Sequence, residues 1–94
     1  MRETTNEWLV AEEICDGLEF LSAEGRVEFD TDVELDGMLV EVVGAVTYES
    51  EYDAASNYRC LTYVSVEIEH VSVPARVRLN ERLIAKYITK ILMR

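Results

Sequence analysis

Apolar and acidic positions alternate from Arg26 to Asp36, a pattern with a period of two that predicts a β-strand. The odd positions are mostly apolar and the even positions after Arg26 are acidic. The strand ends at Asp36-Gly37, a dipeptide that favours a two-residue hairpin turn. Such a turn predicts a register that begins with Leu35 opposite Met38 and joins the apolar face of one strand to the apolar face of the next. The register therefore supports the strand assignment.

Two further strands are expected after this hairpin. The second strand runs to about Tyr52 and a polar loop covers residues 53–57. A third strand returns from Tyr58, and its alternation slips near His70, which indicates a bulge or the end of the strand. Residues 75–79 are expected to add a short edge strand protected by Pro74. The inward face of the third strand is predicted to carry the even-numbered residues Cys60, Val64, Val66 and Ile68.

Helical spacing is found at both ends of the chain. A first helix is predicted from about Thr5 to Cys15, with Thr4 and Glu7 at the spacing of a capping box. The last helix has Asn80 as its expected N-cap. Its apolar stripe consists of Leu83, Ile84, Tyr87, Ile88, Ile91 and Leu92.

These elements predict an α+β fold in a single compact domain over residues 1–94. The expected architecture is a three- to four-stranded antiparallel meander covered by the C-terminal amphipathic helix, with an additional N-terminal helix. Residues 18–25 fit neither period, so a helical turn and a short strand both remain open there.

Composition narrows the classes of protein that this domain can represent. The 94 residues include 19 acidic and 9 basic side chains, which give a formal net charge of −10. This charge disfavours a protein whose whole surface binds the phosphates of nucleic acid, because such binding begins with Lys and Arg. No apolar run reaches the roughly 18 residues that span a bilayer, and Cys15 and Cys60 lack any CxxC spacing. We therefore expect a cytoplasmic protein with buried, reduced thiols.

The acidic row on the first predicted strand is the main candidate for a binding site. Alternate residues on a strand lie about 6.8 Å apart on one face, so these carboxylates repel one another in the isolated protein. A cationic partner would relieve that repulsion, whereas a solvated face that only keeps the protein soluble is the simpler alternative. The candidate partner-binding residues are Glu28, Asp30, Asp32, Glu34 and Asp36, with Glu41 expected opposite Asp32.

Metal-dependent and catalytic chemistry have little support in the sequence. Asp32 begins a partial match to a calcium-binding loop, but the twelfth position is Val43 instead of Glu, and strands flank the segment where helices are required. Nonspecific binding of a divalent cation at Asp30, Asp32 and Glu41 is left open. No dedicated metal site, cofactor site or catalytic residue is predicted. His70 is the single histidine, at the end of a strand, and a small enzyme would need it to lie in a cleft with a carboxylate.

Charge is distributed unevenly along the chain. Residues 1–70 hold 18 acids and 3 bases, a sum of −15, whereas residues 71–94 hold 1 acid and 6 bases, a sum of +5. A possible second interface on the last helix is the basic stripe Arg82, Lys86 and Lys90. The simplest interpretation of this stripe is an ordinary solvated helix face. It also permits a head-to-tail contact with the acidic sheet of another copy, or a small contact with nucleic acid. Of these two contacts we favour the first, because aromatic residues for base stacking are absent.

The second half of the chain, from VTYESEY through YVSVEIEHVSV to RLNERLIAKYITKIL, resembles in layout small bacteriophage accessory proteins with two strands, a short polar joint and a closing helix. The resemblance implies a protein made inside an infected bacterium, and strongly acidic proteins of this kind block host defence complexes, including CRISPR effectors. It transfers no functional residue.

Two functional hypotheses follow. The first is a non-enzymatic acidic protein, a phage-type inhibitor that occupies a basic, nucleic-acid-binding surface of a host protein complex. The alternative is a self-assembling structural or adaptor subunit in which the acidic sheet meets the basic helix of another copy.

Overall fold

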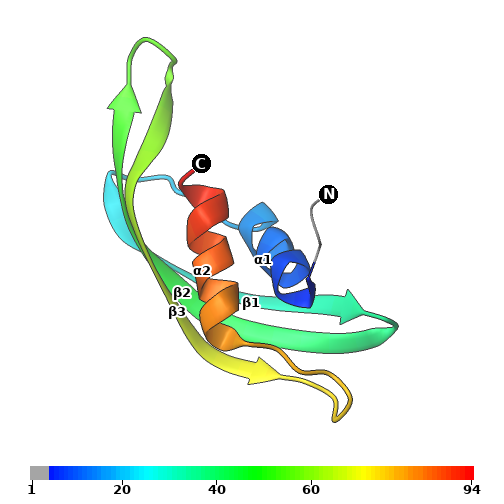
Figure 1. The fold of residues 1–94 in the computed structure, drawn as a ribbon. Helices are drawn as coiled ribbons and strands as arrows, with labels where there is room; N and C mark the ends of the chain where they lie inside the picture. The colour runs from blue at the N-terminus through cyan, green and yellow to red at the C-terminus, as the bar shows by residue number, and fades with distance from the viewer. Residues whose placement is uncertain (1–4) are drawn as a thin grey trace.

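A computed structural model describes residues 5–94, which form two helices and one antiparallel sheet of three strands (Figure 1). The sheet has the order β1-β2-β3, so the α+β class and the antiparallel meander predicted from the sequence are confirmed. The elements are α1 (Asn6–Asp16), β1 (Glu24–Leu35), β2 (Met38–Asp53), β3 (Tyr58–Ser72) and α2 (Glu81–Leu92).

The first hairpin has the register that the sequence predicts. Leu35 lies opposite Met38, and Asp32 lies opposite Glu41. Asp36 and Gly37 have φ angles of 50° and 77°, the left-handed conformation that both central residues of a type I′ turn require. Asp36 therefore belongs to the turn, and the acidic row on the strand itself ends at Glu34.

The second hairpin is longer and less regular than the first. Register shifts occur between Val43 and Gly44 and between Glu49 and Ser50, which leave Glu69 and Thr62 of β3 as bulge residues without a direct partner on β2. The shift at Thr62 reverses the faces beyond it, so Leu61 turns toward the helices. The prediction of an inward, buried Cys60 is wrong for this reason, and Cys60 is exposed.

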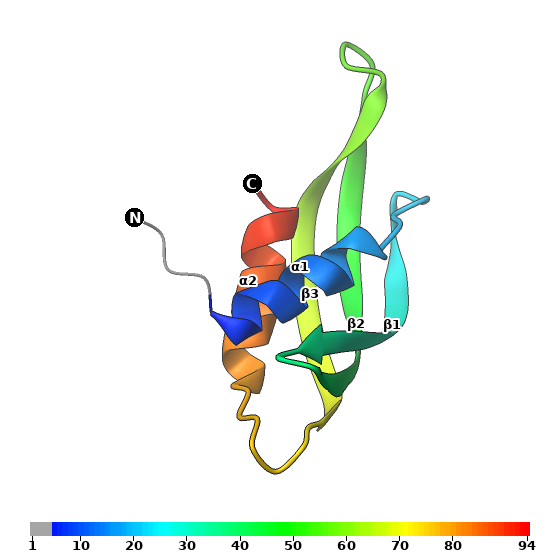
Figure 2. The same cartoon turned by 90° about the vertical axis from the view of Figure 1, so that its right-hand side faces the viewer.

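The hairpin of β2 and β3 extends beyond both helices as an arm (Figure 2). Residues 54–57 form its turn, within the predicted loop. Asp53 organises this turn, because its carboxylate accepts hydrogen bonds from Ala55 N at 3.0 Å and Ser56 Oγ at 2.8 Å. These bonds lower the pKa of Asp53.

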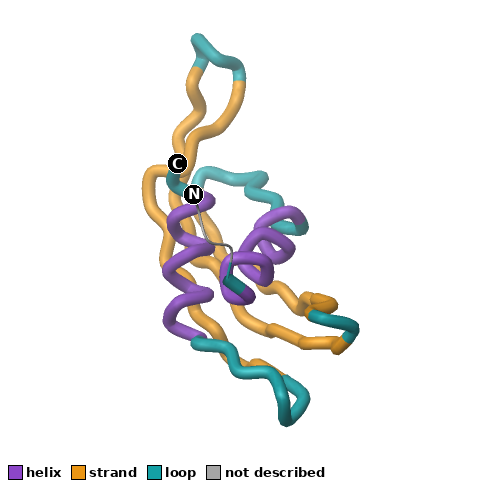
Figure 3. Tube along the Cα trace, turned by 45° about the vertical axis from the view of Figure 1, so that its right-hand side comes forward, coloured by secondary structure: helices purple, strands orange, loops and turns teal. Residues whose placement is uncertain are grey.

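Both helices lie on the same face of the sheet, which we call the inner face (Figure 3). Helix α2 packs on β3, and α1 packs against α2 and the β1 side. Trp8 and Tyr87 join the helices edge to face, with ring centroids 5.1 Å apart. The fully buried side chains at the centre of the core are Val10, Ile14, Val40, Val42, Val46, Ile84 and Ile88.

The start of each helix is fixed by a side-chain cap. Thr5 Oγ1 accepts from Trp8 N at 3.2 Å, and the Asn80 side chain accepts from Leu83 N at 3.2 Å, so the predicted cap at Asn80 is confirmed. Thr4 of the predicted capping box lies outside the described residues. Glu7 instead accepts from Asn80 N at 3.0 Å and ties the start of α1 to the start of α2.

The segment between β3 and α2 is a loop, so the predicted edge strand over residues 75–79 is wrong. Pro74 lacks an N–H for strand pairing, and its carbonyl instead accepts from Val77 N at 3.0 Å in a turn. Val77 is buried and anchors the loop on the core. Residues 18–23, left open by the sequence, are irregular and are held to β2 by Ser50 Oγ, which donates to Ser22 O at 2.8 Å.

Candidate functional site, the acidic outer face

The sheet face turned away from the helices, the outer face, carries the acidic row. On β1 the row consists of Glu28, Asp30, Asp32 and Glu34, all of them exposed. The alternation of the strand places these carboxylates on one side, while Phe29, Val33 and Leu35 are buried on the other. The structure thus brings together every predicted binding residue of β1, with Asp36 beside them in the turn and Glu41 on the neighbouring strand.

Three of these carboxylates come close together. One carboxylate oxygen from each of Asp30, Asp32 and Glu41 lies within 4.8 Å of the other two. A hydrogen bond with Asp30 and repulsion by its charge raise the pKa of Glu41, and Asp32 adds to the effect. The three groups could gather around a divalent cation, but Asp30 and Asp32 are exposed to solvent, so the geometry gives no sign of a dedicated metal site.

Arg26 separates this acidic row from the carboxylates of β3. Its guanidinium reaches across the sheet to Glu67 at 3.3 Å and Glu69 at 3.0 Å, and it lies 4.0 Å from Glu28. Arg26 therefore offsets part of the charge of the β3 carboxylates, whereas Asp30, Asp32 and Glu34 have no ion pair among the residues described. The sequence carried a signal for this role, because Arg26 is the one basic residue between positions 3 and 58.

Helix α1 extends the acidic surface around the β1 edge. A shallow cleft of about 300 Å³ is lined by Glu34 of the acidic row together with acidic and apolar residues of α1 and the end of β1. The acids of α1 that share this cleft with Glu34 are Glu12, Glu13 and Asp16. The uncompensated charge of the region therefore exceeds that of the β1 row alone.

The basic stripe of α2 lies on the opposite side of the molecule. Arg82, Lys86 and Lys90 are exposed and recur every four residues, while Ile84 and Ile88 on the other side of the helix are buried against the sheet. Because the acidic row faces away from the helices, the two charged surfaces point in opposite directions.

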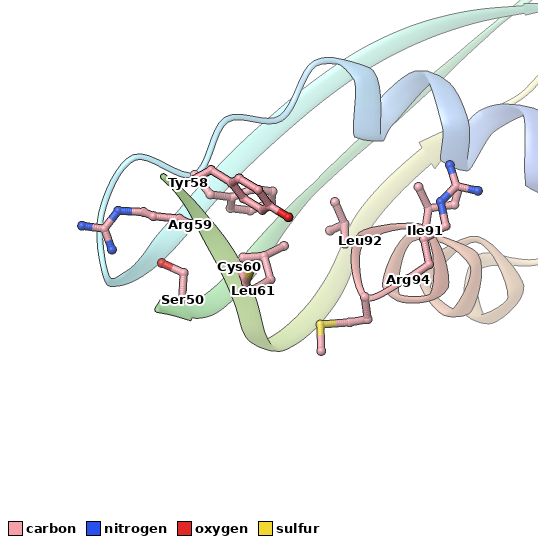
Figure 4. Close-up of a pocket in the computed structure, with 10 residues that line it drawn as sticks. Ser50, Tyr58, Arg59, Cys60, Leu61, Ile91, Leu92 and Arg94 are labelled. Atoms are coloured by element: carbon pink, nitrogen blue, oxygen red, sulfur yellow. The ribbon is translucent and has the colours of Figure 1, made fainter. Parts of the chain in front are cut away.

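A separate cleft of about 460 Å³ lies between the arm and the end of α2 (Figure 4). Its walls include Leu61, Leu92 and Tyr58, whose ring points toward Leu92. Arg59 extends away from this apolar wall, and Ser50 already donates its hydroxyl proton to Ser22 O. Cys60 and Arg94 also line the cleft.

The remaining candidates for chemistry are His70, whose charge lowers the pKa of Glu41, and Cys15. His70 is exposed on the outer face and lies outside the clefts near Glu34 and Tyr58. Burial, followed by the negative charge of Asp16, raises the pKa of the Cys15 thiol to about 11, so this thiol is protonated at neutral pH and a poor nucleophile.

Comparison with known proteins adds no relative. No protein family, curated protein or solved structure matches the chain. Within residues 5–94, neither helix has the length and apolar character needed to cross a membrane.

Proposed function

We propose that the acidic outer face binds a basic, nucleic-acid-binding surface of another protein and thereby blocks it, in the manner of a phage-type inhibitor of a host complex. One observation carries the proposal: Asp30, Asp32 and Glu34 of the acidic row have no ion pair among the described residues, whereas Arg26 pairs with Glu67 and Glu69 on the opposite side of the same face.

The electrostatics of the row favour a cationic partner. Neighbouring carboxylates about 6.8 Å apart repel, and Glu41 and Asp32 face each other directly in the register. A hydrogen bond with Asp30, followed by the negative charge of Asp30 and that of Asp32, raises the pKa of Glu41 and so penalises its charged form. Lys or Arg side chains of a partner would remove the penalty and would also accelerate encounter.

Exposed apolar side chains beside the row would lengthen the lifetime of the complex. Leu39 is 63% exposed and lies opposite Glu34 in the hairpin register, on the outer face. Val43 lies opposite Asp30 and is partly exposed. Burial of such side chains slows dissociation, while the surrounding charge sets the orientation.

Affinity capture from a bacterial lysate with two matched variants tests the proposal. Asp30→Lys, Asp32→Lys and Glu34→Lys together change the net charge from −10 to −4, since each reversal adds two. The control reverses Glu19, Glu49 and Glu51, which are exposed acids away from the row, and reaches the same net charge. We expect the first variant to lose a basic nucleic-acid-binding partner that the control retains and that duplex DNA displaces. Equal capture by both variants would contradict the proposal.

Assembly of the chain with itself is a second candidate, favoured by the opposite placement of the acidic row and the basic stripe on α2. A head-to-tail contact between them would build an open chain of copies. Light scattering across salt concentrations tests it, because such a contact must weaken as salt rises. A monomer at low salt would exclude it.

A further inference from the structure

We propose that strand β3 pairs with β3 of a second copy, in antiparallel orientation, to form a continuous six-stranded sheet. The inference is independent of the proposed function. It begins with the sheet order β1-β2-β3, which leaves the outer edge of β3 without a neighbouring strand among the described residues. The edge is 15 residues long, and the helices cover the inner face of the sheet instead of this edge.

Strand β3 has little of the usual protection of a free edge between its two bulges. Proteins prevent unwanted strand pairing with Lys, Pro or inward-pointing charges on edge strands. Neither Lys nor Pro occurs between Tyr58 and Ser72. The bulges at Thr62 and Glu69 interrupt the strand near its ends, but the six residues 63–68 between them are regular and available for pairing.

The distribution of charge favours pairing at β3 over pairing at β1, the other edge strand of the sheet. Pairing of two β1 strands would bring two acidic rows together, and like charges on adjacent strands are destabilising. On β3, Glu67 and Glu69 are already bound to Arg26 at 3.3 and 3.0 Å. This partly neutralised edge can approach its own copy even though each molecule carries a net charge of −10.

The apolar residues of β3 also remain incompletely covered. Val64, Val66 and Ile68 face the core but are only partly buried, whereas Val40, Val42 and Val46 of β2 are fully buried. A second β3 strand would lie beside this row and remove more of its apolar surface from water. Main-chain hydrogen bonds would supply the remaining affinity, as in other cases of strand addition.

A two-fold axis at Ser65 gives a register that keeps both faces of the sheet continuous. It places Tyr63 opposite Glu67 of the second copy on the outer face and Val64 opposite Val66 on the inner face. Glu69 stays outside the paired segment, and no carboxylate faces another one directly. Because the axis is perpendicular to the sheet, the outer faces of the two copies lie on the same side.

Sedimentation velocity of the full chain at increasing concentration and salt tests the inference. We expect a monomer–dimer equilibrium in which added salt strengthens the dimer, because salt screens the repulsion between two acidic copies while leaving main-chain hydrogen bonds in place. This response is opposite to that of the head-to-tail contact. A chain that stays monomeric at high concentration and high salt would overturn the inference.

Cysteine crosslinking locates the contact. In a Cys60→Ser background, Ser65→Cys is expected to form an intermolecular disulfide under mild oxidation, because the axis places residue 65 beside its own copy. Thr47→Cys is the matched control, since Thr47 lies directly opposite Ser65 on the outer face but on the middle strand. Equal crosslinking of both variants would reject pairing at the β3 edge.

A lysine on the edge strand provides a second test. Ser65→Lys is expected to abolish the dimer without changing the thermal midpoint of the monomer. A dimer that persists in this variant would equally count against pairing at the β3 edge.

Discussion

Strands β1 and β3 are the two edge strands of the sheet, and both present carboxylates to solvent on the outer face. On β3, Glu67 and Glu69 share the guanidinium of Arg26, whereas on β1 the carboxylates of Asp30, Asp32 and Glu34 have no ion pair among the described residues, and Asp30 and Asp32 lie close to Glu41. Carboxylates on the two edge strands thus produce two different surfaces. One is suited to a cationic partner, and the other, where Arg26 offsets part of the charge, can approach the same edge of a second copy.

The largest expected effect comes from adding a side chain at Gly44 of β2, the strand that lies between β1 and β3. Gly44 lies between Phe29 of β1 and Ile68 of β3 in the register. A Cβ at this position would lie 2.7 Å from Phe29 Cζ and would also collide with the Glu67 carbonyl oxygen. We expect Gly44→Ala to lower the free energy of unfolding by about 2 to 3 kcal/mol, as overpacked sites do, measured by urea denaturation. Unchanged stability would show that the sheet accommodates a side chain here.

Removal of Arg26 would make the β3 edge resemble the β1 edge. Its ion pairs are exposed, so we expect Arg26→Met to lower the free energy of unfolding by less than about 1 kcal/mol. The variant should also weaken the β3-paired dimer, because Glu67 and Glu69 would then repel those of the second copy. Arg76→Met, an equal change of charge in the loop before α2, is the control for both measurements. If the dimer were equally stable in both variants, Arg26 would not contribute to the contact at the β3 edge.

The smallest effect concerns the pH dependence of the β1 side. The folded-state pKa of Glu41 lies above its ordinary value of 4.5, so in the pH range above 4.5 the folded chain binds more protons than the unfolded chain. Stability contributed by this group therefore rises as pH falls toward 4.5 and is lower at neutral pH. We expect Glu41→Gln to raise the thermal midpoint slightly at pH 7 and to flatten its acid-side slope, which Glu51→Gln should leave unchanged. An unaltered slope in Glu41→Gln would contradict the coupling with Asp30.

The sequence was sufficient to predict the first hairpin because two independent signals agreed there. The alternation of Val33 and Leu35 with acids set the faces, and Asp36-Gly37 set the register. Both signals concern neighbouring residues, so they do not depend on the remainder of the fold. The acidic row could be predicted for the same reason.

The strands and loop of the second hairpin were also predicted, but the bulge at Thr62 and the role of Arg26 could not be. A bulge at Thr62 adds one residue and reverses the faces beyond it, and the sequence around Thr62 shows no break in alternation like the one near His70 that indicated the bulge at Glu69. That reversal exposes Cys60. The reach of Arg26 to Glu67 and Glu69 depends on the bulged register of β3, which links residues more than forty positions apart in the chain.

The central claim is that the β1 side of the outer face, and not acidity in general, is the binding surface. Titration of the isotope-labelled protein with an arginine-rich peptide, followed by backbone amide chemical shifts, tests it most directly. We expect the largest changes at residues 28–34 and Glu41, with much smaller changes at Glu49 and Glu51 on the arm and at Glu67 and Glu69 beside Arg26. Changes spread evenly over all of these acids would contradict the claim.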